Sequence, residues 1–363
     1  MPEFLSDRVQ KVKPSATLAI TAKANKLKAQ GIQIVPMGSG EPDFDKPENI
    51  QKAGIEAIKN GQTRYTAVDG TPELKTAIID KFERENNLTY SANEVMVSSG
   101  GKQVFYNLCQ AVLSEGDEVI IPAPYWVSYP DMVILADATP VVVETGLEQD
   151  FKITPAQLEA SITKNTKLFI INSPSNPTGA VYSKAELQAL ADVLKQHPQV
   201  LIITDDIYEH IRWGGEDFVN IVMADSALKE RTVILNGVSK GYAMTGWRIG
   251  YGAGPENIIK AMKKIQGQST SNPCSIAQAA ALEALNGDQD IISTMVDAFE
   301  QRHSFIVDAL NAIDGVECPR SQGAFYSFPR IEGLITRLGL KDDVEFSTYC
   351  LEKLNIALVP GSA

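Results

Sequence analysis

The sequence predicts an α/β protein with a large domain, built on a mostly parallel seven-stranded sheet flanked by helices, and a smaller α+β domain. Three observations predict this architecture. Short β-rich runs alternate with helical stretches through most of the chain, which is typical of a doubly wound sheet. Several of these runs are continuously apolar, as expected for strands covered by helices on both faces. The 363 residues, 44% of them apolar, are enough to form two domains.

Seven runs have the length and the apolar content of buried strands. They lie at residues 94–98, 118–121, 141–144, 168–172, 200–205, 232–236 and 248–253. Helical patterns are clearest at residues 17–30, 47–60, 184–196 and 255–265, and a further short strand is expected at 32–36. In an open α/β sheet, ligands bind beyond the carboxyl ends of the strands. The motifs at these strand ends are therefore the candidates for function.

The pattern changes after residue 286. A long helix is expected at residues 288–313, followed by short strands at 315–318 and 324–328 and a helix at 344–354. We interpret this region as a second, smaller domain. The chain then divides into an N-terminal arm with part of the small domain (1–44), a large domain that holds the site (45–287), and the small domain proper (288–363).

The composition argues against several classes of function. The 33 basic and 45 acidic residues give a net charge of −12, which disfavours nucleic acids and anionic membranes as partners. No apolar run is long enough to span a membrane, and no signal peptide is visible. The four cysteines are far apart and the three histidines are scattered, so neither a disulfide framework nor a metal site is expected. These features favour a cytoplasmic protein without a metal.

Two glycine-rich segments resemble nucleotide-binding loops, but each lacks a required residue. A P-loop that contains Gly101 needs a glycine at the position where Met96 stands. The cluster at 250–254 is shorter than the dinucleotide fingerprint, and no acidic residue lies about 20 positions beyond it. What remains is a strand–turn–helix at 98–102, whose free backbone N–H groups suit one phosphate monoester. The alternative is an ordinary turn capped by a serine.

Four strand-end segments carry the residues that a pyridoxal-phosphate site needs. They are NSPSNPTG (172–179), TDDIYE (204–209), NGVSK (236–240) and MTGWRIG (244–250). Such a site needs a lysine amine for a Schiff base and a carboxylate that keeps the pyridine nitrogen protonated. Lys240 can supply the amine and Asp205 the carboxylate. Further donors for the ring oxygen and the phosphate are Asn176, Tyr208, Ser239 and Arg248.

Each of these residues also has an ordinary interpretation. Taken alone, Lys240 would be a surface lysine, Asp205 a turn or cap residue, and Trp126 a packing residue. Asn176 could be a turn former, and Arg248 could be an ion-pair partner. The joint occurrence favours the cofactor site, because several independent coincidences at strand ends would otherwise be required.

The combination of motifs resembles the fold type I pyridoxal-phosphate-dependent aminotransferases of class I/II. The motifs are SNPTG, DDIYE, SKGYAMTGWRIGY and TRYTAVDGTPELK, and the resemblance runs from about residue 38 to residue 325. The segments SSGGKQ, PAPYWVSYP and NSPSNPTGAVY are most similar to the bacterial aspartate/prephenate aminotransferase branch. The resemblance implies an enzyme that uses pyridoxal 5'-phosphate, an amino acid and a 2-oxoacid.

The resemblance also implies roles for residues of the cofactor site. Lys240 would form the Schiff base and then act as general base and acid. Asp205 would bond the pyridine nitrogen, and Trp126 would stack on the ring. Asn176 and Tyr208 would bond the phenolic oxygen. The phosphate would be surrounded by Gly101, Lys102, Ser239 and Arg248.

Other implied roles concern the substrate and the assembly. Tyr65 would reach the phosphate of a neighbouring subunit, which implies a homodimer with shared active sites. Gly40 would lie beside the substrate α-carboxylate, with Trp126 and Asn176 also facing the substrate. Lys102 would meet the distal carboxylate of aspartate or glutamate, and the alternative is a solvated lysine in the first helical turn.

One feature departs from the family pattern. Family members continue past the segment Val-Pro-Gly (359–361) into a stretch with the arginine that binds the substrate α-carboxylate. The sequence here ends at Ala363 and has no arginine after Arg337, which fits no such motif. A protein that ends there is expected to hold the cofactor but to transaminate poorly, since the missing contact contributes about 2–4 kcal/mol.

The predicted reaction transfers the amino group of L-aspartate to 2-oxoglutarate, with oxaloacetate and L-glutamate as products. Alternatives on the same fold are a prephenate, aromatic or alanine aminotransferase, or a β-lyase. An alternative of another class is the cofactor-sensing domain of a transcription regulator. The negative net charge and the early start of the motifs disfavour that last interpretation.

Overall fold

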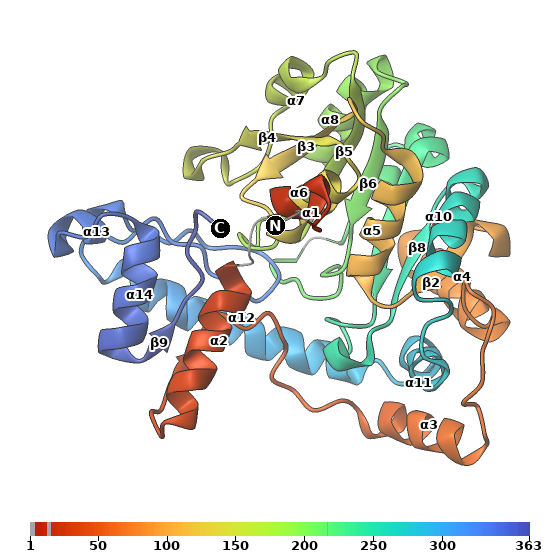
Figure 1. Ribbon diagram of the computed structural model, residues 1–363, viewed down its shortest axis with the longest axis horizontal. Helices are drawn as coiled ribbons and strands as arrows, with labels where there is room; N and C mark the ends of the chain where they lie inside the picture. The colour runs from red at the N-terminus through yellow and green to blue at the C-terminus, as the bar shows by residue number, and fades with distance from the viewer. Residues whose placement is uncertain (1–3, 13–15, 216) are drawn as a thin grey trace.

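The computed structural model describes residues 4–12, 16–215 and 217–363. Seven strands form one sheet in the order β2–β8–β7–β6–β5–β3–β4 (Figure 1). All seven predicted strands are confirmed, with ends within two residues of the prediction. The strands are β2 (Val95–Ser98), β3 (Glu118–Ala123), β4 (Thr139–Glu144), β5 (Thr166–Asn172), β6 (Leu201–Asp205), β7 (Thr232–Gly237) and β8 (Gly250–Ala253).

One strand of the sheet runs against its neighbours. The pairs formed by β3, β4, β5, β6 and β7 are all parallel, whereas β8 is antiparallel to both β2 and β7. Gly250, the first residue of β8, therefore pairs with Gly237, the last residue of β7. The segment that follows β7 and the segment that precedes β8 thus lie at the same rim of the sheet, where the parallel strands end.

Helices cover both faces of the sheet. Alternate residues of each strand point to opposite faces, so Ile120 and Ile171 belong to one buried cluster and Ile121 and Ile170 to another. The first cluster also contains residues of α4 (Pro72–Asn86), α8 (Lys184–Gln196) and α11 (Ser275–Asn286). The second contains residues of α5 (Gly101–Val112), α6 (Ser128–Leu135) and α10 (Glu256–Ser269). This two-layer burial confirms the doubly wound α/β architecture.

Segments from the first and last parts of the chain pair beside the sheet (Figure 1). Strand β1 (Val35–Pro36) pairs in parallel with β9 (Ile356–Ala357), and Ala24 of α2 (Ala16–Ala29) packs in one cluster with Leu351 of α14 (Asp343–Leu354). The long helix α12 (Asp290–Asn311) leads into this region. The remaining helices are α1 (Asp7–Lys11), α3 (Glu48–Lys59), α7 (Pro155–Ser161), α9 (Ile221–Ala224) and α13 (Glu332–Leu338).

The predicted strands at 315–318 and 324–328 are wrong. This region of the described chain has only isolated bridges, between Glu317 and Arg330 and between Arg212 and Gly323. The side chain of Asn311 bonds the backbone N–H and carbonyl of Cys318, at 2.7 and 2.9 Å, so these groups need no neighbouring strand. None of the described helices is long and apolar enough to cross a membrane.

Candidate active site

The candidate site lies at the rim where the parallel strands end. Asp205 is the last residue of β6, and Lys240 follows β7 by three positions. Arg248 precedes β8, which starts at this rim because it is antiparallel. The N-terminus of α5 lies at the same place, since a Cβ atom at Gly250 would collide with the backbone nitrogen of Gly101. The topology thus brings the predicted residues together.

Lys240 is a largely buried lysine whose ammonium has few polar partners. Its Nζ donates a hydrogen bond to the carbonyl oxygen of Gly40 and lies 5.8 and 5.6 Å from the ring centroids of Tyr208 and Phe325. It forms no ion pair within the described chain. Burial, together with the charge of Arg248, lowers the pKa of Lys240 to about 8. A substantial fraction of the amine is therefore unprotonated, and nucleophilic, at mildly alkaline pH.

Asp205 is a buried carboxylate held at both oxygens. Tyr129 donates its hydroxyl to Oδ2 at 2.6 Å, and the backbone N–H of Ile207 donates to Oδ1 at 3.2 Å. Burial raises the pKa of Asp205 to about 6 despite these two bonds. The amide of Asn172, on the neighbouring strand β5, donates to the carbonyl oxygen of Asp205 at 2.8 Å and so fixes the strand end. The carboxylate is thus rigid and ready to accept a proton or a strong donor.

Tyr208 lies three residues after Asp205 and is also buried. Its hydroxyl shares a 2.5 Å hydrogen bond with the hydroxyl of Tyr326. The ring of Phe325 packs edge-on against Tyr208, at 5.6 Å between centroids. Burial, with the neighbouring Tyr326, raises the pKa of Tyr208 well above its usual value, so the hydroxyl keeps its proton and acts as a donor.

The turn before α5 forms an open corner for an anion. Its cap residue Gly100 has φ 92° and offers no side chain, and a Cβ atom there would collide with the guanidinium of Arg248. Arg248 donates to the carbonyl oxygens of Thr245, at 2.9 Å, and Ser99, at 3.4 Å. The alternative of a serine cap is not seen, because the cap residue is Gly100 and no described side chain bonds the first N–H groups of the helix. The start of the helix, whose first N–H groups have no partner within the helix, thus lies next to the guanidinium of Arg248.

The aromatic rings of Trp126 and Tyr129 lie near the turn that precedes α5. Trp126 packs edge-on against Tyr129, with 5.3 Å between ring centroids. The Nζ atom of Lys102 lies 5.0 Å from the ring centroid of Trp126. Partial burial and the charge of Arg248 lower the pKa of Lys102. The side chain of Lys102 is exposed, as the alternative of a solvated lysine expects, and its ammonium also lies close enough to the Trp126 ring for a cation–π contact.

The other predicted residues lie at different distances from this centre. Ser239 is buried next to Lys240, and Asn176 is half-buried, with its backbone N–H bonded to Asn172 at 2.7 Å. Gly40 contacts Lys240 through its carbonyl, and a Cβ atom there would lie 3.3 Å from the hydroxyl of Tyr326. The side chain of Tyr65 is 92% exposed and makes no contact with the centre.

Sequence reasoning missed three residues of the site: Tyr129, Asn172 and Tyr326. Asn172 opens the motif that contains Asn176, and Tyr129 lies three residues after Trp126, so each stood in a segment already identified. Their partners, however, are set by the pairing of β5 with β6 and by the position of α6. Tyr326 comes from the region after α12, and nothing in the sequence connects it with Tyr208.

The groups present fit the chemistry of pyridoxal phosphate. The cofactor needs an uncharged amine for its aldehyde, an anionic partner for its pyridine nitrogen, an aromatic surface and an anion site. A buried amine, a buried carboxylate, the Trp126 ring and the corner between Gly100 and Arg248 are all found at one rim.

Comparisons with known proteins give concordant results. The sequence profile of the family described as "Aminotransferase class I and II" matches residues 32–363. The aspartate/prephenate aminotransferases of Nitrosomonas europaea and Cereibacter sphaeroides are 58% and 55% identical to the chain. The alignments cover 99% of this chain and 92% and 91% of those proteins.

Two solved structures are also close. The aspartate aminotransferase of Rhizobium meliloti superposes with a TM-score of 0.95 at 46% identity, over 99% of this chain and 91% of that one. The Thermus thermophilus aspartate aminotransferase with maleate gives a TM-score of 0.92 at 42% identity, over 99% of this chain and 92% of that one.

Proposed function

Because the chain belongs to the class I and II aminotransferases, a family of pyridoxal-phosphate-dependent enzymes, we propose that it transfers the amino group of L-aspartate to 2-oxoglutarate. The products are oxaloacetate and L-glutamate. The observation that carries the assignment of residues is the pair of oppositely shifted groups at one rim of the sheet. Burial lowers the pKa of Lys240 to about 8 and raises the pKa of Asp205 to about 6.

Pyridoxal phosphate supplies an aldehyde that binds amines and a ring that accepts electrons from the substrate carbon. Lys240 would hold this aldehyde through Nζ, and its free amine would take the proton from the substrate Cα. The low pKa of its amine favours both roles. Asp205 would accept the N–H of the pyridine ring and keep that proton in place. Tyr208 and Asn176 would donate to the ring oxygen, and Trp126 would cover one face of the ring.

The anion corner suits the phosphate group. The backbone N–H of Gly101, at the start of α5, would bind the phosphate at the positive end of the helix dipole, and Arg248 would supply the counter-charge. Ser239 adds a hydroxyl, and Lys102 adds a second cation at the edge.

Substrate selection is assigned to groups around this corner. Gly40 lies beside Lys240 and is placed to meet the α-carboxylate. Lys102, together with Trp126 and Asn176, is placed to meet a second carboxylate. The maleate named with the Thermus thermophilus enzyme is a four-carbon dicarboxylate and supports this choice. Prephenate is a second candidate acceptor, because the relatives from Nitrosomonas europaea and Cereibacter sphaeroides are named for it and it also carries two carboxylates.

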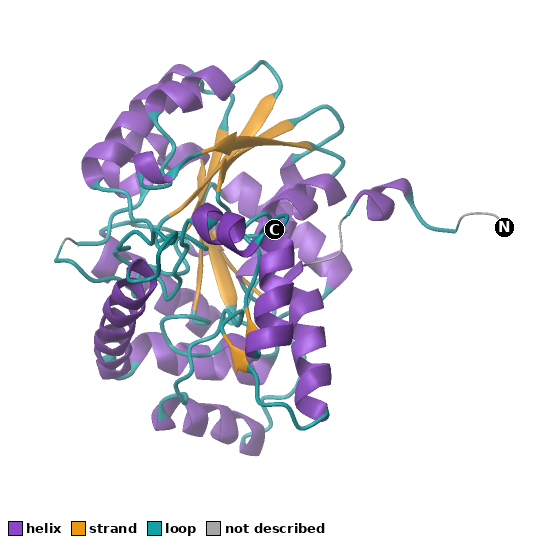
Figure 2. Ribbon diagram, turned by 90° about the vertical axis from the view of Figure 1, so that its left-hand side faces the viewer, coloured by secondary structure: helices purple, strands orange, loops and turns teal. Residues whose placement is uncertain are grey.

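A homodimer with shared sites is part of the proposal. Tyr65 is 92% exposed, and the N-terminal segment, which carries α1 and the 90% exposed Phe4, extends from the body of the molecule (Figure 2). Exposed apolar side chains of this kind suit a second subunit. The division into 1–44, 45–287 and 288–363 is supported by the parallel pairing of β1 with β9, which joins the first and last parts. A cytoplasmic location is supported by the four unpaired cysteines.

The experiment has two stages. The purified protein is incubated with pyridoxal phosphate, its visible spectrum is recorded, and the modified residue is located by mass spectrometry after borohydride reduction. Attachment at Lys240 is expected, and a colourless, unmodified protein would overturn the proposal. Steady-state assays then compare aspartate, glutamate, alanine and tyrosine as donors with 2-oxoglutarate and prephenate as acceptors. We expect the highest kcat/KM with aspartate and 2-oxoglutarate, and a preference for alanine or tyrosine would refute the substrate assignment.

A further inference from the structure

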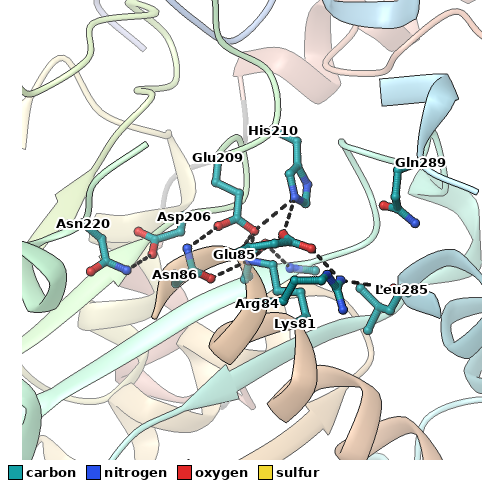
Figure 3. Close-up of polar contacts among 12 residues, drawn as sticks. Lys81, Arg84, Glu85, Asn86, Asp206, Glu209, His210, Asn220, Leu285 and Gln289 are labelled. Atoms are coloured by element: carbon teal, nitrogen blue, oxygen red, sulfur yellow. Dashed lines mark hydrogen bonds and ion pairs between the residues drawn. The ribbon is translucent and has the colours of Figure 1, made fainter. Parts of the chain in front are cut away.

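A buried network of charged side chains (Figure 3) includes Glu209 and His210, which follow Tyr208 of the candidate site in the sequence. Its centre is Lys81 of α4, which has no exposed surface. The Nζ atom of Lys81 forms an ion pair with Glu209, lies 3.5 Å from a carboxylate oxygen of Glu85, and donates to the amide oxygen of Asn86 at 2.8 Å. His210 closes the network from the other side, with Nε2 2.8 Å from a carboxylate oxygen of Glu85.

The ligand atoms of Glu85, Glu209 and His210 lie within 4.8 Å of one another, as they would around a metal ion. The ammonium of Lys81 already supplies the positive charge between the two carboxylates. Burial opposes the ionisation of Glu209, but Lys81 and His210 together hold the pKa of Glu209 below its usual value. The cluster is therefore an internal ion network, and its cation is part of the chain.

The carboxylate of Glu209 joins three segments of the fold. Its Oε1 accepts from the amide of Asn236 at 2.7 Å, and its Oε2 accepts from the amide of Asn86 at 3.1 Å. Asn236 belongs to β7 and lies four positions before Lys240, and Glu209 itself directly follows Tyr208. One buried carboxylate therefore connects α4, the segment that carries Asp205 and Tyr208, and the strand end that leads to Lys240.

From this connectivity we propose that Lys81 and Glu209 are positioning residues that fix the spacing between Lys240 and the Asp205–Tyr208 segment. Neither residue touches the reacting atoms, and each acts through the backbone segments that Glu209 joins. The inference rests on the proposed function, because the distances that it concerns matter only for a site built from Lys240, Asp205 and Tyr208.

Stability alone does not explain such a network. The desolvation of a buried ion pair can exceed the Coulombic gain, and an apolar pair of similar volume is often as stable. A network with fully satisfied partners does fix one arrangement of the segments that it joins. Reactive groups must be held within about 0.5 Å of their productive positions, and a misplacement of about 1 Å can cost a hundredfold in rate.

The test uses Lys81→Met and Glu209→Gln, with Lys75→Met as a matched control. Lys75 is also in α4, is also largely buried, and forms a 2.7 Å ion pair with Asp69. In the described chain, neither residue of that pair bonds the segments around Asp205 or Lys240. The unfolding temperature of the cofactor-free protein and the dissociation constant for pyridoxal phosphate are measured for each variant. The pH midpoint of the change in visible absorbance of the loaded protein is also measured, together with the steady-state kcat and KM for aspartate.

Lys81→Met and Lys75→Met are expected to lower the unfolding temperature by similar amounts. Only Lys81→Met and Glu209→Gln are expected to weaken pyridoxal phosphate binding by about fivefold or more, to move the absorbance midpoint, and to lower kcat about tenfold with KM for aspartate nearly unchanged. The variant that combines Lys81→Met with Glu209→Gln is expected to lose no more kcat than the more impaired of the two single variants, because the two residues act as one unit.

Two results would overturn the inference. One is a loss of cofactor affinity and kcat in the Lys75→Met control equal to that in Lys81→Met. The other is a loss of stability in Lys81→Met and Glu209→Gln with cofactor affinity and kcat unchanged. If Lys81→Met does not fold, the milder Glu209→Gln variant decides by the same criteria. A wild-type protein that stays colourless with pyridoxal phosphate would instead reject the proposed function. Failure of the inference and failure of the function are therefore distinguishable.

Discussion

Lys81, which is buried, and Lys240, which is partly buried, lie on either side of the segment that follows β6, in opposite environments. Lys240 is next to Tyr208 and has one carbonyl partner, aromatic neighbours and no carboxylate within ion-pair distance in the described chain. Lys81 is next to Glu209 and is surrounded by two carboxylates and an amide oxygen. The adjacent residues Tyr208 and Glu209 thus face two different amines: that of Lys240, which has no carboxylate partner among the described residues, and that of Lys81, whose charge is balanced by carboxylates. The difference teaches that burial makes a lysine available for chemistry only where carboxylates do not supply counter-charge.

The largest expected effect separates the two lysines. In the proposed function, Lys240 supplies the amine that binds the cofactor and moves the proton, so we expect Lys240→Ala to lower kcat by at least about three orders of magnitude. Lys81→Met should cost only about tenfold, since its effect is indirect. Steady-state transamination and borohydride labelling of both variants measure the contrast. Similar losses in the two variants would remove the distinction between a reactive lysine and a positioning one.

A second, smaller effect concerns the carboxylate on the reactive side. Asp205→Asn keeps the size of the side chain but removes the negative charge, and we expect kcat to fall by about two to three orders of magnitude. Tyr129→Phe, which removes one hydrogen bond to Asp205, should cost about tenfold or less. Single-turnover assays with aspartate test both variants. A loss in Tyr129→Phe as large as that in Asp205→Asn would mean that the hydrogen bond, and not the charge, dominates.

The pH dependence of cofactor capture sharpens the comparison further. The pKa of Lys240 lies at about 8, below its usual value, so the reactive unprotonated fraction rises with pH and levels off above that point. The rate at which cofactor-free protein takes up pyridoxal phosphate should rise about tenfold per pH unit below about pH 7 and flatten above about pH 8. Rapid mixing with absorbance detection measures the rate. A flat profile between pH 6 and 8 would contradict the low pKa.

The smallest effect concerns Asp206, which borders the ion network. Burial raises the pKa of Asp206 to about 8, so the folded protein keeps a proton that the unfolded chain releases above about pH 4. Stability should therefore fall as pH rises from about 4 to 8. Asp206→Asn lacks this proton, and the hydroxyl of Thr204, now 2.5 Å from the carboxylate, can reverse to accept from the new amide.

The cofactor-free Asp206→Asn variant should thus lose the decline in unfolding temperature between pH 5 and pH 8, a difference of about 1–3 °C relative to wild type. Thermal unfolding at both pH values measures it. Parallel declines in the two proteins would show that Asp206 does not hold the proton.

Much of the fold was readable from sequence because each signal was local. Several of the seven strands are continuous apolar runs between turn residues, and strand ends carry the motifs that pointed to Asp205 and Lys240. The predicted strand at 315–318 was wrong because the backbone of Cys318 bonds to the side chain of Asn311, a contact between different elements. The predicted strand at 324–328 was also wrong, and there the backbone N–H of Ala324 bonds to the carbonyl oxygen of Ile211. The partner of Tyr208, Tyr326, lies 118 residues away in the sequence and was hidden for the same reason.

The ion network was equally hidden. Lys81 lies in the pattern ELKTAIIDKFEREN, where it reads as one more polar residue on the outside of an amphipathic helix. Its complete burial follows from the carboxylate that the segment after β6 presents to it. A single sequence shows the type of each residue, but the pairing of a lysine in one helix with a glutamate 128 positions later requires the tertiary structure.

The antiparallel direction of β8 determines where the chain can be opened without separating Lys240 from Arg248. Because β8 starts where β7 ends, Lys240 and Arg248 both lie in the short loop that connects these two strands. Had β8 run the other way, its four residues would have carried Arg248 to the far edge, about 13 Å off. A circular permutant opened inside this loop would therefore separate Lys240, the proposed attachment point of the cofactor, from Arg248, the proposed phosphate ligand. New termini on the opposite edge of the sheet would leave the two residues in one continuous segment.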